Sequence, residues 1–146
     1  VVGRVVDGIN QGETVLFTRD THEENYLDTQ EGKKLPVPHC IRGTEGWEII
    51  DQLTEYTVDR TVVDKPTFGS RELGRILAAE QEPVEKITFI GLCTDICVIS
   101  NALLAKAFLP EAEIAVDAVC CAGVTPESHR NALAAMQVCQ ITVENG

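Results

Sequence analysis

The sequence predicts an α/β fold in which helices cover both faces of a mainly parallel sheet. Short apolar runs rich in β-forming residues alternate with helix-like patterns along almost the whole chain. The runs are apolar enough for strands buried on both faces, as in parallel sheets with right-handed crossovers. No repeat, low-complexity tract or linker interrupts the 146 residues, so we expect a single domain over residues 1–146.

The first half of the chain supplies two of the expected strands. Gly12 suits the end of an opening amphipathic helix. The elements expected in order are a helix at 1–12, a strand at 14–19, a charged loop at 20–46, a short helix at 47–53 and a strand at 60–65. A crossover helix should follow a strand, so we expect a further strand upstream of residue 1.

The second half is more regular. Thr125 suits the N-cap of the last helix, because Pro126 at the first helical position and an acidic residue follow it. The expected elements are a helix at 70–81, a strand at 86–92, a helix at 94–108, a strand at 113–119, a helix at 125–138 and a strand at 140–145.

The composition narrows the class of partner and the compartment. Acidic residues outnumber basic ones 23 to 12, which argues against binding to nucleic acid or to an anionic membrane surface. No apolar run approaches the length of a membrane span, and no signal peptide is visible. The six cysteines lie mostly in apolar or strand-like segments. We therefore expect a cytoplasmic protein with reduced, mostly buried thiols.

Polar residues follow three of the strands at the point where each one ends. They are Asp20 to His22, Lys65, and the junction from Cys93 to Cys97. The carboxyl ends of parallel strands lie along one edge of a sheet, which is where sites form in this class of fold. These side chains could therefore converge.

Cys97 falls in the first turn of the helix expected at 94–108, with Thr94 and Asp95 as N-cap residues. Unpaired amides and the helix dipole at that place favour a thiolate and could hold an oxyanion. A buried small side chain is the commoner role of such a cysteine. A disulfide-forming pair with Cys93 is a third possibility, although C-x-x-x-C is not the usual redox spacing.

The loop at 20–46 offers donors for a metal. Asp20 and His22 are two residues apart on an extended segment and can face one way, and His39 and Glu31 lie further along the loop. Carboxylate and imidazole suit Zn²⁺, Mn²⁺ or Fe²⁺. The alternative is that these are solvated loop residues.

Three further residues have less specific signals. Lys65 could be a cation beside the thiol or a solvated lysine at a strand end. His129 lies among surface-type residues and is interpreted as structural. Asp117, on an apolar strand, could be either a buried hydrogen-bonding group or a site residue, and this stays open.

Four segments together resemble the isochorismatase-like cysteine hydrolases, and nicotinamidases in particular. "GLCTDICVISNA" is similar to the nucleophile motif, "TRDTHEENY" with "PHCIRGTEGWEI" to the metal segment, and "VDKPTFGS" to the segment of the catalytic lysine. "DAVCCAGVTPESHRNAL" is similar to the strand and helix that come next in the family. The resemblance covers essentially the whole chain.

The resemblance implies a three-layer α/β/α, Rossmann-like fold around a six-stranded, mainly parallel sheet, with the first strand missing here. It implies that Cys97 is the nucleophile, that Lys65 is the triad lysine, and that the amides of Cys93 and Cys97 hold the oxyanion. It also implies a cis peptide bond before Cys93 and a pocket lined by Phe68. The implied metal ligands, for zinc or else manganese or iron, are Asp20, His22, His39 and Glu31.

The triad aspartate is the departure from the family pattern. In the family it lies in a D-x-Q motif at the end of the first strand, and no predicted strand here ends in that motif. Asp7 lies on the opening helix and does not fit. We expect this aspartate on the upstream strand.

The function implied by the resemblance is hydrolysis of nicotinamide to nicotinate and ammonia through a cysteine thioester. The expected partner is a small carboxamide, and a homo-oligomer is possible. The alternatives are another cysteine amidase acting on a carbamoyl or ureido compound, and a catalytically inactive binding or interaction chain that lacks the triad aspartate.

Overall fold

The computed structural model describes residues 1–146 and contains six α-helices and five strands. The chain divides into two compact units, which we describe separately. One comprises residues 6–67 with Val2, and the other comprises residues 68–146 with Val1 and residues 3–5. The opening helix α1, Val2–Asn10, contributes residues to both units, and Gly12 follows it with a φ of +79°. This left-handed conformation suits glycine and ends the helix as expected.

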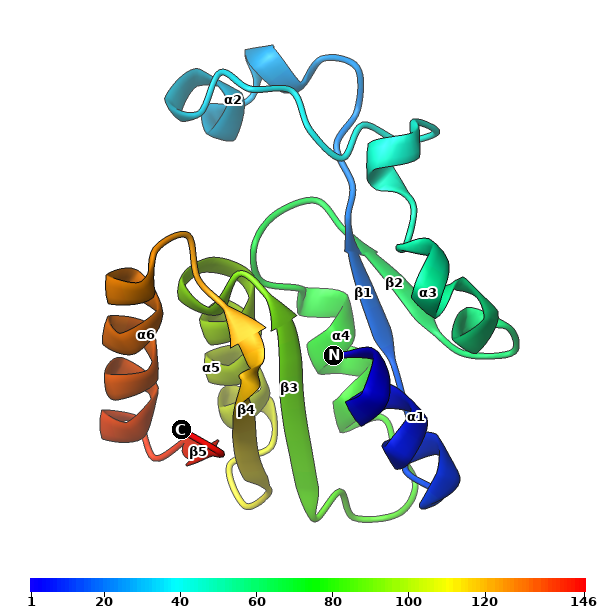
Figure 1. Ribbon diagram of the computed structural model, residues 1–146, viewed down its shortest axis with the longest axis vertical. Coiled ribbons are helices and arrows are strands. Elements are labelled where there is room, and N and C mark those ends of the chain that lie inside the picture. Colours follow the sequence, from blue (N-terminus) through cyan, green and yellow to red (C-terminus); the bar gives the residue numbers. More distant parts are fainter. The chain divides into compact units, whose positions relative to one another are not determined.

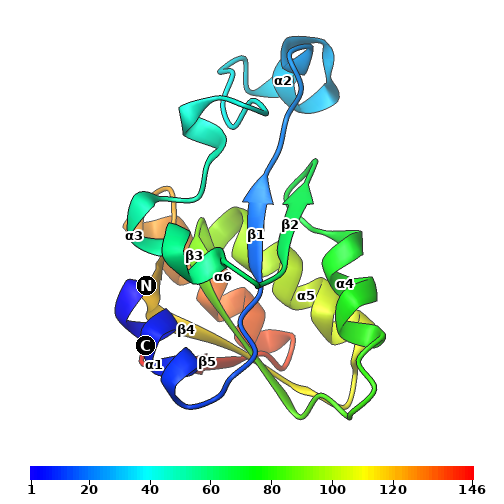
Figure 2. The ribbon, with the colours of Figure 1, turned by 90° about the vertical axis from the view of Figure 1, so that its right-hand side faces the viewer.

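The first unit is built on a two-stranded parallel sheet. Strand β1, Phe17–Asp20, pairs with β2, Val62–Lys65, and the two strands lie side by side in Figure 2. In the register of this pair Asp20 lies opposite Lys65. The residues between the strands form short helical segments: 3₁₀ turns at Tyr26–Asp28, Glu45–Trp47 and Glu55–Thr57, and the helices α2, Gln30–Lys34, and α3, Asp51–Thr54.

An isolated parallel bridge closes the loop that follows β1. The amide of His22 donates to the carbonyl of Cys40 at 2.9 Å, and the amide of Arg42 donates to the carbonyl of His22 at 2.8 Å. The two ends of the loop, about twenty residues apart in sequence, are thereby held side by side.

The second unit contains a three-stranded parallel sheet in the order β3-β4-β5. The strands are β3, Lys86–Leu92, β4, Glu113–Ala122, and β5, Thr142–Glu144. Helix α4, Arg71–Ala78, packs on α5, Ile99–Phe108, which packs in turn on α6, Pro126–Val138 (Figure 1). Residues 114–118 of the central strand β4 are all buried, as a strand covered on both faces requires.

The predicted α/β class, with parallel strands flanked by helices, is confirmed. The parallel strands form two sheets, in the orders β1-β2 and β3-β4-β5, one in each unit. The helix expected at 47–53 is instead a 3₁₀ turn and the short helix α3, separated by extended backbone at Glu48.

The helix expected at 94–108 also begins differently. Residues Thr94–Val98 form one π-helical turn before α5, and the N-cap is Cys93, without a side-chain cap. The expectation that Thr94 and Asp95 act as caps is therefore wrong, because other partners engage their side chains. None of the six cysteines is fully buried, five being partly exposed and Cys139 exposed, which corrects the expectation of mostly buried thiols.

Candidate active site

Three of the predicted metal ligands converge in the loop between β1 and β2. His22 Nε2 lies 3.4 Å from Glu31 Oε1, and His39 Nε2 lies 3.7 Å from the same oxygen. The three ligand atoms all lie within 4.8 Å of one another. This spacing allows one cation to contact two imidazole nitrogens and a carboxylate oxygen.

Local structure explains why these side chains meet. The backbone bridge that fixes His22 beside residues 40–42 also brings the neighbouring His39 close. Glu31 lies in the first turn of α2, whose N-cap Thr29 accepts a hydrogen bond from the Gly32 amide at 3.0 Å. A Cβ on Gly32 would lie 2.0 Å from the Tyr26 carbonyl oxygen, so only glycine lets α2 approach this closely.

The ring of His39 is held in the form that a metal requires. Its Nδ1 lies 2.8 Å from the carbonyl oxygen of Val37. A carbonyl only accepts, so Nδ1 carries the proton and Nε2 keeps its lone pair. This is the second contact that metal-binding histidines usually make, and it leaves Nε2 to face Glu31.

Two buried atoms of the cluster have no hydrogen-bond partner. They are His22 Nε2 and Glu31 Oε1, which belong to side chains only 7% and 17% exposed. Buried polar atoms are nearly always paired, so two unpaired polar atoms that face each other are unusual. A divalent cation would satisfy both, and the nitrogen and oxygen donors fit Zn²⁺, Mn²⁺ or Fe²⁺.

Tyr26 forms an aromatic wall beside the two histidines. Its ring centroid lies 4.7 Å from that of His22 and 5.1 Å from that of His39. The side chain is 1% exposed, and its hydroxyl donates to the Leu35 carbonyl at 2.9 Å. Burial, together with the nearby charge of Glu31, raises the pKa of Tyr26, so the phenol stays neutral.

Asp20 and Lys65 contact each other across the β1–β2 pair. The Lys65 ammonium donates to Asp20 Oδ1 and, at 3.4 Å, approaches the Thr67 carbonyl. Lys65 is only 3% exposed, which argues against a solvated lysine. The cluster of ligand atoms comprises His22, Glu31 and His39, and metal binding by Asp20 stays a prediction.

A network of charges supports the loop on the sheet. The Arg19 guanidinium lies 3.5 Å above the Trp47 ring and donates to Asp64 at 2.9 Å, and the Trp47 indole donates to Thr21 at 2.8 Å. Arg42 donates to Asp64 and to Glu23, both at 3.0 Å. Burial raises the pKa of Asp64, but the hydrogen bonds from the two arginines outweigh it and lower the pKa overall.

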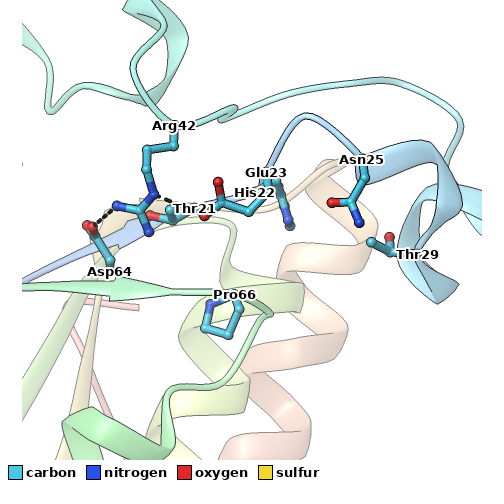
Figure 3. A pocket seen from close by; sticks show the side chains of 8 residues that line it. All are labelled: Thr21, His22, Glu23, Asn25, Thr29, Arg42, Asp64 and Pro66. Atoms are coloured by element: carbon cyan, nitrogen blue, oxygen red, sulfur yellow. Dashed lines mark hydrogen bonds and ion pairs between the residues drawn. The ribbon is translucent and has the colours of Figure 1, made fainter.

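The same network borders a hollow of about 350 Å³ beside His22 (Figure 3). In Figure 3 the Arg42 guanidinium lies between two carboxylates at one side of this hollow. Its lining residues are Thr21, His22, Glu23, Asn25, Thr29, Arg42, Asp64 and Pro66.

Cys97 lies in the π-helical turn Thr94–Val98 of the second unit. The Thr94 hydroxyl is hydrogen-bonded to His129 Nδ1 at 2.8 Å, and the Asp95 carboxylate accepts from the Val124 amide at 3.2 Å. The peptide bond between Leu92 and Cys93 is cis, as the resemblance implied. The turn thus joins the end of β3 to the N-terminal end of α6.

The remaining predicted residues occupy clear positions. Phe68 precedes α4, and its side chain is 41% exposed. Asp117 is buried on β4 and accepts a hydrogen bond from Asn145 at 3.1 Å, and His129 contacts Thr94, which suits a structural role. Sequence reasoning assigned no role to Tyr26 or Asn101, although both lie within segments that resemble the family. For Asn101, a polar residue four positions after Cys97 in an apolar helix was the available signal.

No helix has both the length and the apolar character needed to cross a membrane.

In comparisons with known proteins, the family model described as the isochorismatase domain matches residues 2–145. An uncharacterized isochorismatase family protein PncA of Bacillus subtilis is 26% identical over an alignment of 114 positions, and the alignment covers 70% of this chain and 60% of that protein. The chain therefore aligns with less than two thirds of the length of this curated relative.

Two solved structures illustrate the similarity in fold. The crystal structure of nicotinamidase/pyrazinamidase PncA from Bacillus subtilis is 26% identical with a TM-score of 0.84, covering 99% of this chain and 82% of that one. A pyrazinamidase of Pyrococcus horikoshii, solved in complex with zinc, is 24% identical with a TM-score of 0.78. The match covers 97% of this chain and 80% of that one. Because the family model matches nearly the whole length of this chain, the chain belongs to the isochorismatase family.

Proposed function

We propose that this chain is a cysteine amidase that hydrolyses nicotinamide to nicotinate and ammonia. The observation that carries the proposal is that the ligand atoms of His22, Glu31 and His39 converge. Two of these atoms, His22 Nε2 and Glu31 Oε1, are buried without a hydrogen-bond partner. Membership of the family and the similarity of the Bacillus subtilis nicotinamidase support it. Among the family's amidases, an intact metal set favours nicotinamide over carbamoyl or ureido substrates.

The metal ligands are His22, Glu31 and His39, with Asp20 as a further candidate, and zinc fits the nitrogen and oxygen donors best. A bound cation would hold the pyridine nitrogen and orient the ring, and it would not supply the nucleophile. The pyrazinamidase of similar fold that was solved with zinc is consistent with this choice. Tyr26, whose ring lies against both histidines, supplies apolar surface beside the donors.

Cys97 carries the covalent chemistry in this proposal. Its thiolate attacks the carboxamide carbon and forms a carbon–sulfur bond, while the amides of Cys93 and Cys97 hold the negative oxygen. The carbon–nitrogen bond then breaks, and nitrogen leaves as ammonia after accepting a proton. Water attacks the thioester, the carbon–sulfur bond breaks, and nicotinate and the free thiol are released.

Lys65 is the lysine of the triad by resemblance. Its burial and its contact with Asp20 support a specific role over that of a solvated surface charge. The resemblance assigns the role of proton acceptor for the thiol to an aspartate.

Ammonia release from nicotinamide tests the proposal directly. The assay uses the natural protein that contains these residues, loaded with zinc, with Cys97→Ala and Cys139→Ala as matched variants. Cys139 is exposed and lies after α6, so Cys139→Ala controls for the loss of any thiol. We expect activity in the wild type and in Cys139→Ala, and none above background in Cys97→Ala.

Three results would contradict the proposal. Full activity of Cys97→Ala would remove the nucleophile assignment. A folded, zinc-loaded protein that releases no ammonia from nicotinamide, but does so from a carbamoyl or ureido compound, would place it among the other amidases of the family. Silence with all of these substrates would favour a binding role.

A further inference from the structure

Asn101 is a buried amide at the base of the turn that carries Cys97. It lies on α5, only 5% of its surface is exposed, and the mechanism above does not use it. Asparagine is unfavourable inside a helix and costly to bury unless its polar atoms are paired. Its presence in this otherwise apolar helix therefore calls for a specific role.

The side chain of Asn101 uses both ends of its amide. Nδ2 donates to the Cys97 carbonyl at 2.8 Å and to the Phe68 carbonyl at 3.0 Å. Oδ1 accepts from the Ser70 amide at 2.8 Å. One side chain thus ties the backbone of the nucleophile turn to the segment of residues 68–70 that leads into α4.

The backbone around these contacts is closely packed. A Cβ on Gly69 would lie 2.6 Å from Leu104 Cδ1 and 3.5 Å from Ser100 Cβ, so residues 68–70 press against α5. The Ser100 hydroxyl donates to the Ile96 carbonyl at 2.6 Å, which adds a second side-chain contact to the same turn. Small movements at Asn101 would therefore be transmitted to the turn instead of being absorbed by empty space.

We propose that Asn101 is a positioning residue that holds the Cys97 turn in a fixed relation to Phe68. A nucleophile acts efficiently only when it is held within a fraction of an ångström of its productive position. The two Nδ2 hydrogen bonds reach the two segments that the family resemblance assigns to the nucleophile and to the pocket wall. The proposal rests on the proposed function only in naming Cys97 as the nucleophile.

Two variants separate the donors of Asn101 from its acceptor. Asn101→Ala removes all three hydrogen bonds. Asn101→Asp keeps the shape and an oxygen for the Ser70 amide but loses both donors. The matched control is Ser70→Ala, which removes the hydroxyl that accepts from the Leu73 amide at 3.0 Å and caps α4, yet leaves the backbone amide that Asn101 binds.

The first readout is hydrogen exchange of the amides in residues 94–98. We expect exchange there to accelerate about tenfold or more in Asn101→Ala and Asn101→Asp, since both lose the two Nδ2 hydrogen bonds that tie the turn to residue 68. In Ser70→Ala we expect faster exchange in the first turn of α4 and no change at 94–98. The aspartate variant keeps the test meaningful if the alanine variant does not fold.

The second readout is the pH dependence of Cys97 alkylation by iodoacetamide, followed by mass spectrometry on the tryptic peptide of residues 87–106. We expect the pH midpoint of alkylation to shift in both Asn101 variants and to stay unchanged in Ser70→Ala, because only the Asn101 variants release the turn that holds the thiol. Unchanged exchange at 94–98 in both Asn101 variants would overturn the proposal, as would the same change in Ser70→Ala. Neither readout needs a substrate, so a failure to hydrolyse nicotinamide would not affect the result.

Discussion

Replacing Glu31 by glutamine should change the stability of the protein in opposite directions with and without metal. In the metal-free protein, Glu31 Oε1 is buried without a hydrogen-bond partner and lies 3.4 Å from the unpaired His22 Nε2. Both atoms are acceptors when the neutral imidazole of His22 carries its proton on Nδ1, which is the tautomer that leaves Nε2 free to bind a metal. Glutamine has the same shape and brings an N–H group that can donate to that nitrogen.

The two effects can be sized from this geometry. Leaving a buried polar atom unpaired costs about 1–3 kcal/mol, and a new hydrogen bond contributes about 1 kcal/mol. We therefore expect Glu31→Gln to raise the free energy of unfolding of the metal-free protein by about 1 kcal/mol. Zinc at a hundred times its dissociation constant should stabilise the wild type by about 2.7 kcal/mol. For a chain of this length that corresponds to a rise in Tm of about 5–10 °C.

The assay is thermal unfolding followed by circular dichroism, in EDTA and at fixed free zinc. A hundredfold loss of affinity in Glu31→Gln would leave only about 0.4 kcal/mol of the zinc stabilisation at the same free zinc. The matched control is Glu24→Gln, an exposed glutamate of the same loop, which should follow the wild type in both conditions. An equal zinc shift in wild type and Glu31→Gln would refute the reasoning and would place zinc elsewhere, for example on the thiols. In EDTA, a Tm of Glu31→Gln well below that of the wild type would also refute the reasoning.

Three further substitutions test other parts of the structure. Gly32→Ala should destabilise the protein by more than about 2 kcal/mol in chemical denaturation and weaken zinc binding in titration, because its Cβ would meet the Tyr26 carbonyl oxygen at 2.0 Å. Asp64→Asn should cost stability at pH 7. Since the pKa of Asp64 is lowered in the folded protein, that difference should persist above about pH 5 and shrink as the pH falls below about 4, which urea unfolding at several pH values would check. Thr125→Ala should lower the free energy of unfolding by about 1 kcal/mol through loss of the capping box with Ser128, without changing zinc affinity.

Elements with strong local signals were predictable from the sequence. Strand β3 has the expected bounds, Lys86–Leu92, because seven residues rich in β-forming side chains leave little choice. Helix α6 begins where expected, since Thr125 and Pro126 are signals that act within a few residues. In such places local preference and tertiary packing agree.

The turn of Cys97 was not predictable, because distant partners decide its geometry. Thr94 and Asp95 are good N-caps by type, yet His129 and the Val124 amide engage their side chains. These partners lie 35 and 29 residues away in sequence. Local rules for caps describe a helix in isolation and cannot include such competition.

The candidate metal cluster was predictable in composition but not in arrangement. An Asp-x-His sequence on an extended segment suggested that Asp20 and His22 face one way, and two histidines in one loop suggested donors. The backbone bridge from His22 to Ile41 brings His39 to the site, whereas the cross-strand position of Lys65 places a cation against Asp20. Both depend on strand pairing between distant residues.

The bridge between His22 and Ile41 also makes the geometry of the donors insensitive to the length of the loop. His22 is fixed at one end by backbone hydrogen bonds, and the proton position of His39 is set two residues away by Val37. Doubling a flexible loop costs only about 0.6 kcal/mol. The exposed residues 23–25 could therefore gain an insertion while both imidazoles stay in place. An insertion here would reshape the hollow beside His22, which Glu23 and Asn25 help to line, without moving the two imidazoles.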